Sequence, residues 1–135
     1  FKSSDLRKSF DNGNTEEAID KLKAVYASIP YDLLKKADEA HYSTAFFCMM
    51  KALGANIGSE LETSKGRIDA VLENKTHIYI FEFKYNKTAD EALSQIHETK
   101  YYEPYLRGKK KVHLIGMNFS ASEKNINEWK EEVLA

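Results

Sequence analysis

Two carboxylates and a lysine on neighbouring apolar segments are the residues best suited to chemistry. Alternation along the segment His77–Tyr85 places Glu82 and Lys84 on one face, behind Ile78 and Ile80. A strand that is apolar on both faces is usually buried, and charges there are costly unless they are paired, hydrogen-bonded or bound to a metal. Spacing alone also allows a second interpretation, in which the two charges emerge into solvent at the strand end and pair with each other.

A second acid, Asp69, interrupts the preceding apolar segment Arg67–Glu73. The short polar turn between the segments predicts an antiparallel hairpin, which brings Asp69 beside Glu82 and Lys84. Two carboxylates at one sheet edge suit Mg²⁺ or Mn²⁺, because such ions bind one or two carboxylates and complete their shell with water and substrate phosphate. The metal would activate a bound water, and Lys84 would orient that water or stabilise the transition state.

Periodicity and capping signals predict the elements that position these residues. Asn14 and Glu17 begin a one-faced helix over 14–28, and Pro30 and Gly54 bound a second helix over 31–53. Three strands follow over 56–63, 67–73 and 77–85, then a helix from Thr88 to about 104–106 and a strand over 111–119. Helical spacing of three apolar residues predicts a C-terminal helix through Ile126, Trp129 and Val133. The predicted fold class is α/β, a mixed sheet between helices with flanking N- and C-terminal helices.

Length and composition limit the classes of protein to which the chain can belong. The 135 residues fit one globular domain, and the apolar runs are too short to span a membrane. A net charge of −1 removes the simplest argument for nucleic-acid binding, a strongly basic domain. Cys48 lies in the run AFFCMM, where we expect a buried thiol that suits the cytoplasm. Because the chain begins without Met and shows no secretory signal, we expect a fragment of a longer cytoplasmic protein.

Asp69, followed thirteen residues later by Glu82-Phe83-Lys84 on consecutive predicted strands, resembles the PD-(D/E)XK nuclease superfamily, with Ile68 where the motif expects Pro. The stretches GRIDAVLE, IYIFEFKYNKTADEALSQI and KVHLIGMNFS are similar to a bacterial family in which such a domain follows an AAA-ATPase-like domain. The resemblance covers about residues 15–130 and implies a restriction-endonuclease-like core. We accordingly expect a helical extension over 1–30, a nuclease-like domain over 31–135, and an AAA-ATPase-like domain of the same full-length protein as a partner.

The resemblance also implies roles for individual residues. Asp69 and Glu82 correspond to the metal-binding acids and Lys84 to the catalytic lysine, with the Phe83 carbonyl as a further ligand. Gln95 resembles the glutamine that follows the lysine strand in several members.

Two helical residues are weaker site candidates. Glu39 could supply the acid that often comes from the first core helix, or could be an acid favoured by the helix N-terminus. Tyr102 shares the helical face of Gln95, although the usual spacing would put the tyrosine at Thr99.

The predicted nucleic-acid contacts are basic or aromatic residues near the site or in the turn 107–111, although a basic run of this kind is more often a solvated loop: Arg67, Lys87, Tyr102, Lys109 and Lys110. The predicted function is a Mg²⁺-dependent phosphodiesterase acting on DNA or RNA. The alternative is a catalytically silent nuclease-like module that binds nucleic acid or a partner protein. A third hypothesis is a structural domain in which these charges merely pair.

Overall fold

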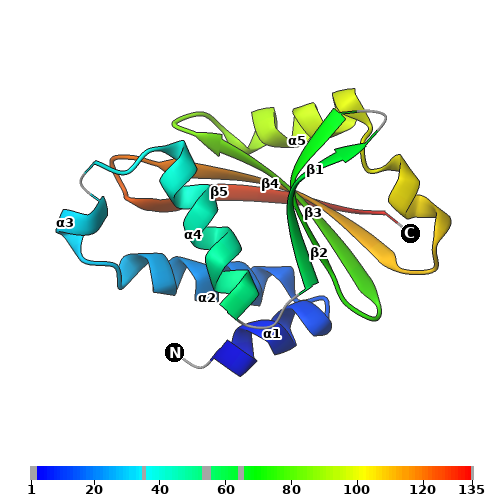
Figure 1. Ribbon diagram of the computed structural model, residues 1–135, viewed down its shortest axis with the longest axis horizontal. Helices are drawn as coiled ribbons and strands as arrows, with labels where there is room; N and C mark the ends of the chain where they lie inside the picture. Colours follow the sequence, from blue (N-terminus) through cyan, green and yellow to red (C-terminus); the bar gives the residue numbers. More distant parts are fainter. Residues whose placement is uncertain (1–2, 35, 53–55, 64–65, 135) are drawn as a thin grey trace.

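The computed structural model of the chain describes residues 3–34, 36–52, 56–63 and 66–134 (Figure 1). Within these residues a five-stranded mixed sheet has its strands in chain order, with only β3 and β4 parallel. The strands are β1 (Asn56–Thr63), β2 (Gly66–Glu73), β3 (His77–Tyr85), β4 (Lys111–Ser120) and β5 (Asn125–Leu134). The helices are α1 (Ser3–Asp11), α2 (Thr15–Ala27), α3 (Tyr31–Leu34), α4 (Glu39–Ala52), α5 (Ala89–Thr99) and the 3₁₀ helix η1 (Glu103–Arg107).

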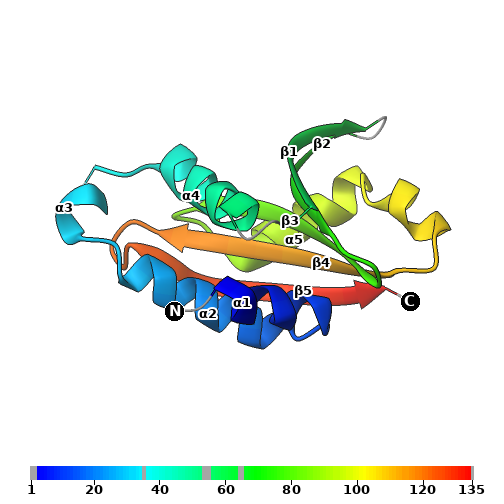
Figure 2. The same ribbon diagram turned by 60° about the horizontal axis from the view of Figure 1, so that its bottom comes forward.

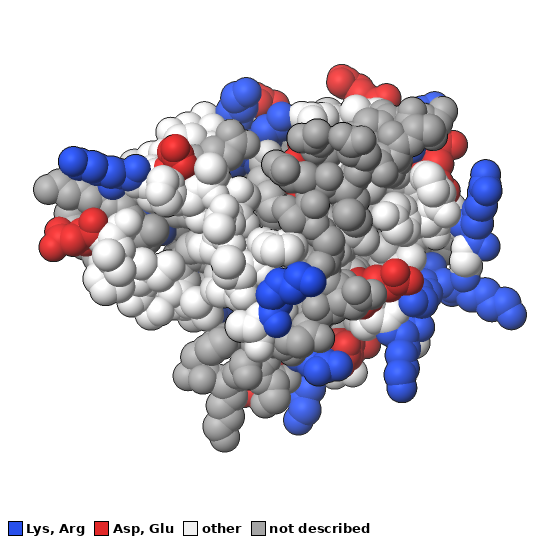
Figure 3. All heavy atoms as spheres, in the orientation of Figure 1, with Lys and Arg blue, Asp and Glu red and all other residues white. Residues whose placement is uncertain are grey.

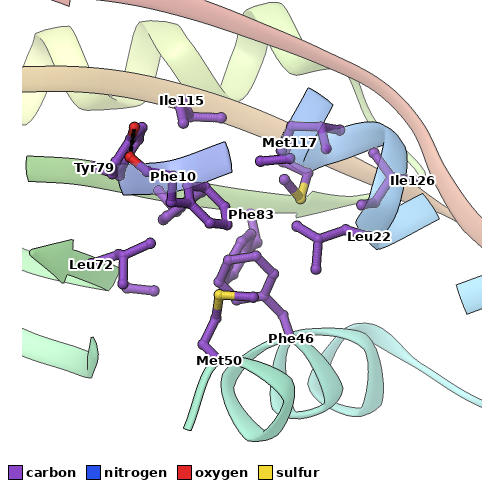
Figure 4. Packing of buried hydrophobic residues seen from close by; sticks show 14 of the residues in the cluster. Phe10, Leu22, Phe46, Met50, Leu72, Tyr79, Phe83, Ile115, Met117 and Ile126 are labelled. Atoms are coloured by element: carbon purple, nitrogen blue, oxygen red, sulfur yellow. Dashed lines mark hydrogen bonds between the residues drawn. The ribbon is translucent and has the colours of Figure 1, made fainter. Parts of the chain in front are cut away.

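One face of the sheet packs against α1, α2 and α4. Alternate side chains of β3, among them Tyr79 and Phe83, point into this core, where Phe46 and Met50 of α4 meet Phe10 of α1 (Figure 4). The ring centroids of Phe46 and Phe83 lie 5.1 Å apart in an edge-to-face arrangement, the geometry that aromatic pairs favour. The apolar alternation of β3 and β4 therefore serves a continuous core on this side.

The opposite face packs against α5. Ile78 and Ile80 of β3 meet Ile96 of α5 and the buried Tyr101 that follows it. Gly116 of β4 lets the helix come close, because a Cβ there would lie 2.6 Å from the carbonyl oxygen of Ala89. Gly116 pairs with Glu82 of β3 in the parallel register, so this glycine determines how closely α5 approaches the sheet next to Glu82.

A chain of hydrogen bonds ties the start of α2 to the sheet. His77 and His113 join through Nδ1 and Nε2 at 2.8 Å, His113 Nδ1 bonds Glu131 at 2.8 Å, and the Thr15 hydroxyl donates to Glu131 at 2.5 Å. Burial and the neighbouring His113 lower the pKa of His77. Burial tends to raise the pKa of Glu131, but the bonds from His113 and Thr15 outweigh it and lower that pKa.

Most predicted elements are confirmed. The three consecutive strands and the strand from Lys111 occur where periodicity puts them. Asn14 caps α2 by accepting from the Glu17 N–H at 3.2 Å, and Thr88 caps α5 by accepting from the Glu91 N–H at 3.0 Å. α5 ends earlier than predicted, at Thr99, because Lys100 takes a left-handed conformation and the chain continues into η1.

The predicted C-terminal helix is wrong, because residues 125–134 form β5, paired with β4. The register runs from Asn118 opposite Glu128 to Phe119 opposite Ile126, which leaves Asn127 as an extra residue, a β-bulge. The bulge shifts the alternation by one position, so Ile126, Trp129 and Val133 fall on one face at spacings that imitate a helix.

The predicted helix over 31–53 is also wrong in its continuity. α3 ends at Leu34 and α4 begins at Glu39, where the Asp38 carboxylate accepts from the His41 N–H at 3.2 Å as a new N-terminal cap. The expected burial of Cys48 is wrong as well, because α4 turns Phe46 and Met50 towards the sheet and leaves Cys48 exposed.

The N-terminal helices share the main core, although α1 was not predicted. Leu6 and Phe10 of α1 and Ile19 and Leu22 of α2 are almost completely buried against the sheet. The division of the chain at residue 30 stays a prediction. In the described part of the chain, no helix is both long and apolar enough to cross a membrane.

Candidate active site

Asp69 lies where strands β2 and β3 part. Their ladder runs from Glu73 opposite Ile78 to Ala70 opposite Phe81, so Asp69 and Glu82 are the next residues facing each other. There the Phe83 N–H donates to Asp69 Oδ2 at 2.9 Å. The Asp69 carboxylate thus takes the place of the backbone carbonyl that would accept the next hydrogen bond of the ladder. Beyond this point the β1–β2 hairpin rises away from the sheet (Figure 2).

Glu82 is buried beside this first acid. Only 3% of Glu82 is exposed, and the Tyr101 hydroxyl donates to its Oε2 at 2.6 Å. Burial, the charge of Asp69 and a hydrogen bond between the two carboxyl groups raise the pKa of Glu82 to about 8. Glu82 therefore tends to keep its proton near neutral pH and can donate it in a hydrogen bond to Asp69.

Lys84 stands two residues further along the same face of β3. Its Nζ donates to Oε1 of Gln95, which projects from α5. The hydroxyl of Thr99 donates to the backbone carbonyl of Gln95 at 2.8 Å, one helical turn on. The lysine is half-buried and held by an amide oxygen. Its charge acts on the acid pair, since it tends to lower the pKa of Glu82.

The donor set fits a hard divalent cation. In an extended strand, N–H and C=O of one residue point the same way, so the Phe83 carbonyl lies on the Asp69 side with its N–H. Two carboxylates and a carbonyl match the oxygen ligands that Mg²⁺ takes, and a cation would relieve the repulsion that raises the pKa of Glu82. Among the described residues, no group of three or more His, Cys, Asp or Glu side chains forms a metal site.

Tyr101 is the site residue that sequence reasoning missed. The left-handed Lys100 turns the chain at the end of α5, which brings the fully buried Tyr101 under Glu82. Burial and the bond to Glu82 raise the pKa of Tyr101, so its hydroxyl keeps its proton and remains a donor. Tyr102, the predicted contact, packs edge-on against His97 instead, with centroids 6.1 Å apart. The pair of tyrosines after the glutamine was the available signal.

The predicted nucleic-acid contacts fall at both ends of β3. Lys87 is exposed in the loop after Lys84, where its N–H donates to Asn118 at 2.9 Å. Lys109 and Lys110 lie at the opposite end, and Lys110 pairs with Glu73 at 2.6 Å.

Two further predicted site residues are placed by backbone alone. Arg67 pairs with Glu62 in the β1–β2 register. Glu39 is the first residue of α4, on the face of the sheet opposite α5. The side chains of Arg67 and Glu39 are outside the described part of the chain.

The fold and the site together define a class. A helix, three antiparallel strands, a crossover helix and a parallel fourth strand carry Asp on β2 and Glu-x-Lys on β3, the arrangement of a restriction-endonuclease-like core. Residues 37–129 match the PD-(D/E)XK nuclease superfamily, and the chain belongs to that superfamily.

One relative is a protein of Azotobacter chroococcum mcd 1 named as an uncharacterized protein in the vnfD 5' region. It is 33% identical over 109 residues, which make up 76% of this chain and 21% of the relative. The chain thus spans about a fifth of the relative's length.

Proposed function

We propose that this domain is a Mg²⁺- or Mn²⁺-dependent phosphodiesterase that cleaves DNA or RNA. The observation that carries the proposal is the close pair formed by the buried Glu82 and the half-buried Asp69, hydrogen-bonded to each other within reach of the charge of Lys84. Two carboxylates this close repel each other when both are charged, which is costly in a purely structural role. A bound divalent cation would attract both and remove this repulsion.

Asp69, Glu82 and the Phe83 carbonyl would hold the ion. When bound, the ion would lower the pKa of a water ligand and offset negative charge on the reacting phosphate. Tyr101 acts as a positioning residue, because its donated bond keeps Glu82 Oε2 oriented within the apolar cluster under α5.

Lys84 supplies the positive charge next to the reacting phosphate. Its ammonium either orients the attacking water or stabilises the charge that develops on phosphate oxygens. Gln95 holds this ammonium through its amide oxygen, which accepts a hydrogen bond without cancelling the positive charge.

The test is cleavage of labelled single- and double-stranded DNA and RNA in Mg²⁺ or Mn²⁺. Asp69→Asn and Lys84→Met should each lower the rate by about 100-fold or more, the usual cost of removing one group that stabilises transition-state charge. Lys36→Met, an exposed lysine between α3 and α4, is the matched control and should cleave like the unaltered protein. Equal rates for all four proteins would refute the proposal.

The second candidate is a catalytically silent module that keeps the acids to bind a cation, nucleic acid or a partner protein. The net charge of −1 favours it, because unaided binding to phosphate usually needs a basic surface. A domain that binds Mn²⁺ through Asp69 but cleaves no substrate would support this candidate.

We further propose a cytoplasmic setting in which the domain serves an AAA-ATPase-like domain of the same protein. The sequence resemblance and the much greater length of the Azotobacter relative support this part of the proposal. Cleavage by the full-length protein with ATP and with a non-hydrolysable analogue tests it, and equal rates would contradict the linkage.

A further inference from the structure

Five cationic side chains gather at the end of the sheet where β3 and β4 begin, which we call the basic end. The β2–β3 turn contributes Lys75, and the connection from η1 into β4 contributes Arg107, Lys109, Lys110 and Lys111. The two turns lie side by side, because the Lys111 N–H donates to the Thr76 carbonyl at 3.0 Å. Figure 3 shows Lys and Arg side chains gathered where Figure 1 places these turns.

The basic end is unusual in a chain of near-zero charge. Within residues 73–77 and 106–111, five cations face one carboxylate, Glu73, so the local net charge is +4, whereas the whole chain carries −1. Glu73 pairs with Lys110, and the side chains of Lys75, Arg107 and Lys109 are exposed. Concentrating like charges in this way costs self-repulsion, which an anionic ligand relieves.

The sheet register fixes how far the basic end lies from the site. Lys111 lies opposite His77, and Asn118 lies opposite Lys84. The register between these two pairs is unbroken, so β3 and β4 lead directly from the basic end to the candidate site. From His77 to Glu82 is five residues and to Lys84 seven, or roughly 17 to 23 Å at the rise of a β-strand. Phosphates along one strand of a duplex recur about every 3.4 Å, so this span corresponds to about five to seven nucleotides.

We propose that the basic end is a second contact for the phosphate backbone of the nucleic acid whose reacting phosphate sits at Asp69 and Glu82. The inference rests on the proposed function and adds a length requirement. A duplex must extend about six base pairs beyond the reacting phosphate on one side before it reaches Lys75 and Lys109.

Binding of fluorescent duplexes of 6, 10, 14 and 20 base pairs, in DNA and RNA series, tests this length requirement. Anisotropy is measured with Ca²⁺ in place of Mg²⁺, which keeps an oxygen-binding cation between the acids and the phosphate, and a gel of each sample checks that the duplex is uncut. Lys75→Gln/Lys109→Gln removes two charges at the basic end, and Lys23→Gln/Lys36→Gln removes two from α2 and the α3–α4 connection as the matched control. All four are surface positions, and thermal melts establish that the variants remain folded.

The basic-end variant should bind the 14- and 20-base-pair duplexes about tenfold more weakly and the shortest duplex unchanged. Its salt dependence, the slope of log affinity against log salt, should become shallower by about 2 because two phosphate contacts are lost. The control should match the unaltered protein at every length. The series with the larger length-dependent loss, DNA or RNA, identifies the preferred backbone.

An equal loss at all lengths, an equal loss in the control, or no binding by any protein would overturn the inference. The cleavage test separates this failure from failure of the nuclease proposal. Cleavage that depends on Asp69 and Lys84, together with unchanged long-duplex binding by the basic-end variant, would refute the second contact alone. The expected length dependence without any cleavage would refute the phosphodiesterase alone.

Discussion

Replacing Glu82 with glutamine should stabilise the metal-free protein, increasingly so as pH rises. Burial and Asp69 raise the pKa of Glu82 from 4.5 to about 8, so the folded protein binds this proton more tightly than the unfolded chain does. The resulting stability is fully present below pH 4.5 and is lost as pH rises towards 8. Each pH unit within that window corresponds to about 1.4 kcal/mol, or roughly 3 kcal/mol between pH 5 and pH 7.

Urea unfolding of both proteins at several pH values measures the difference directly. Glutamine keeps the shape and still accepts from Tyr101, so the free energy of unfolding of Glu82→Gln minus that of the unaltered protein should grow steadily with pH. Glu98→Gln, on the exposed side of α5, is the control and should change little. Mg²⁺ should stabilise the unaltered protein at pH 8 and have little effect on Glu82→Gln. A difference that stays flat from pH 5 to pH 8 would refute the reasoning.

Three further predictions concern the surroundings of the site and the opposite face. Gly116→Ala places a methyl group against the backbone of α5 and should lower the free energy of unfolding by about 3 kcal/mol in urea, whereas Gly108→Ala, with nothing within 4 Å, should be neutral. Tyr101→Phe should weaken Mn²⁺ binding in calorimetry about tenfold, as loss of a bond to a metal ligand does elsewhere, and Tyr102→Phe should not; equal affinities would contradict the positioning role. Because hydrogen bonds lower the pKa of Glu131 below its ordinary value of 4.5, its stabilising charge is lost only as pH falls below that value; Glu131→Gln should cost about 2 kcal/mol at pH 7 and flatten the loss of stability below pH 4.5. An unchanged acid slope in urea would contradict the last of these.

The strands and their capped helices were predictable because their signals are local. The hairpin over β2 and β3 needs only alternation and a polar turn, and the caps at Asn14 and Thr88 are set by neighbouring residues. β5 was not predictable in this way. Its bulge at Asn127 exists only in the pairing with β4, and without that pairing the spacing of Ile126 and Trp129 favours a helix.

The acids and the lysine could be placed from alternation and the predicted hairpin, since Asp69 and Glu82 come directly after the last pair of the ladder, Ala70 opposite Phe81. Tyr101 escaped because its position depends on where α5 ends, and the left-handed turn at Lys100 carries no distinctive residue type. Contacts that need an irregular backbone, such as a bulge or a helix end, are those that periodicity cannot supply.

The chain of hydrogen bonds through Thr15 and Glu131 has a consequence for how the molecule folds. The candidate site lies wholly within residues 69–101. Two hydrogen bonds join α2 to β5: the Thr15 hydroxyl donates to Glu131, and the Asn125 side chain donates to the Lys23 carbonyl at 3.0 Å. These contacts join residues more than 100 positions apart and close large loops, which is slow in folding. The ribosome therefore synthesises the candidate site residues before it synthesises β5. The core beneath the site closes only afterwards, when the contacts between α2 and β5 form.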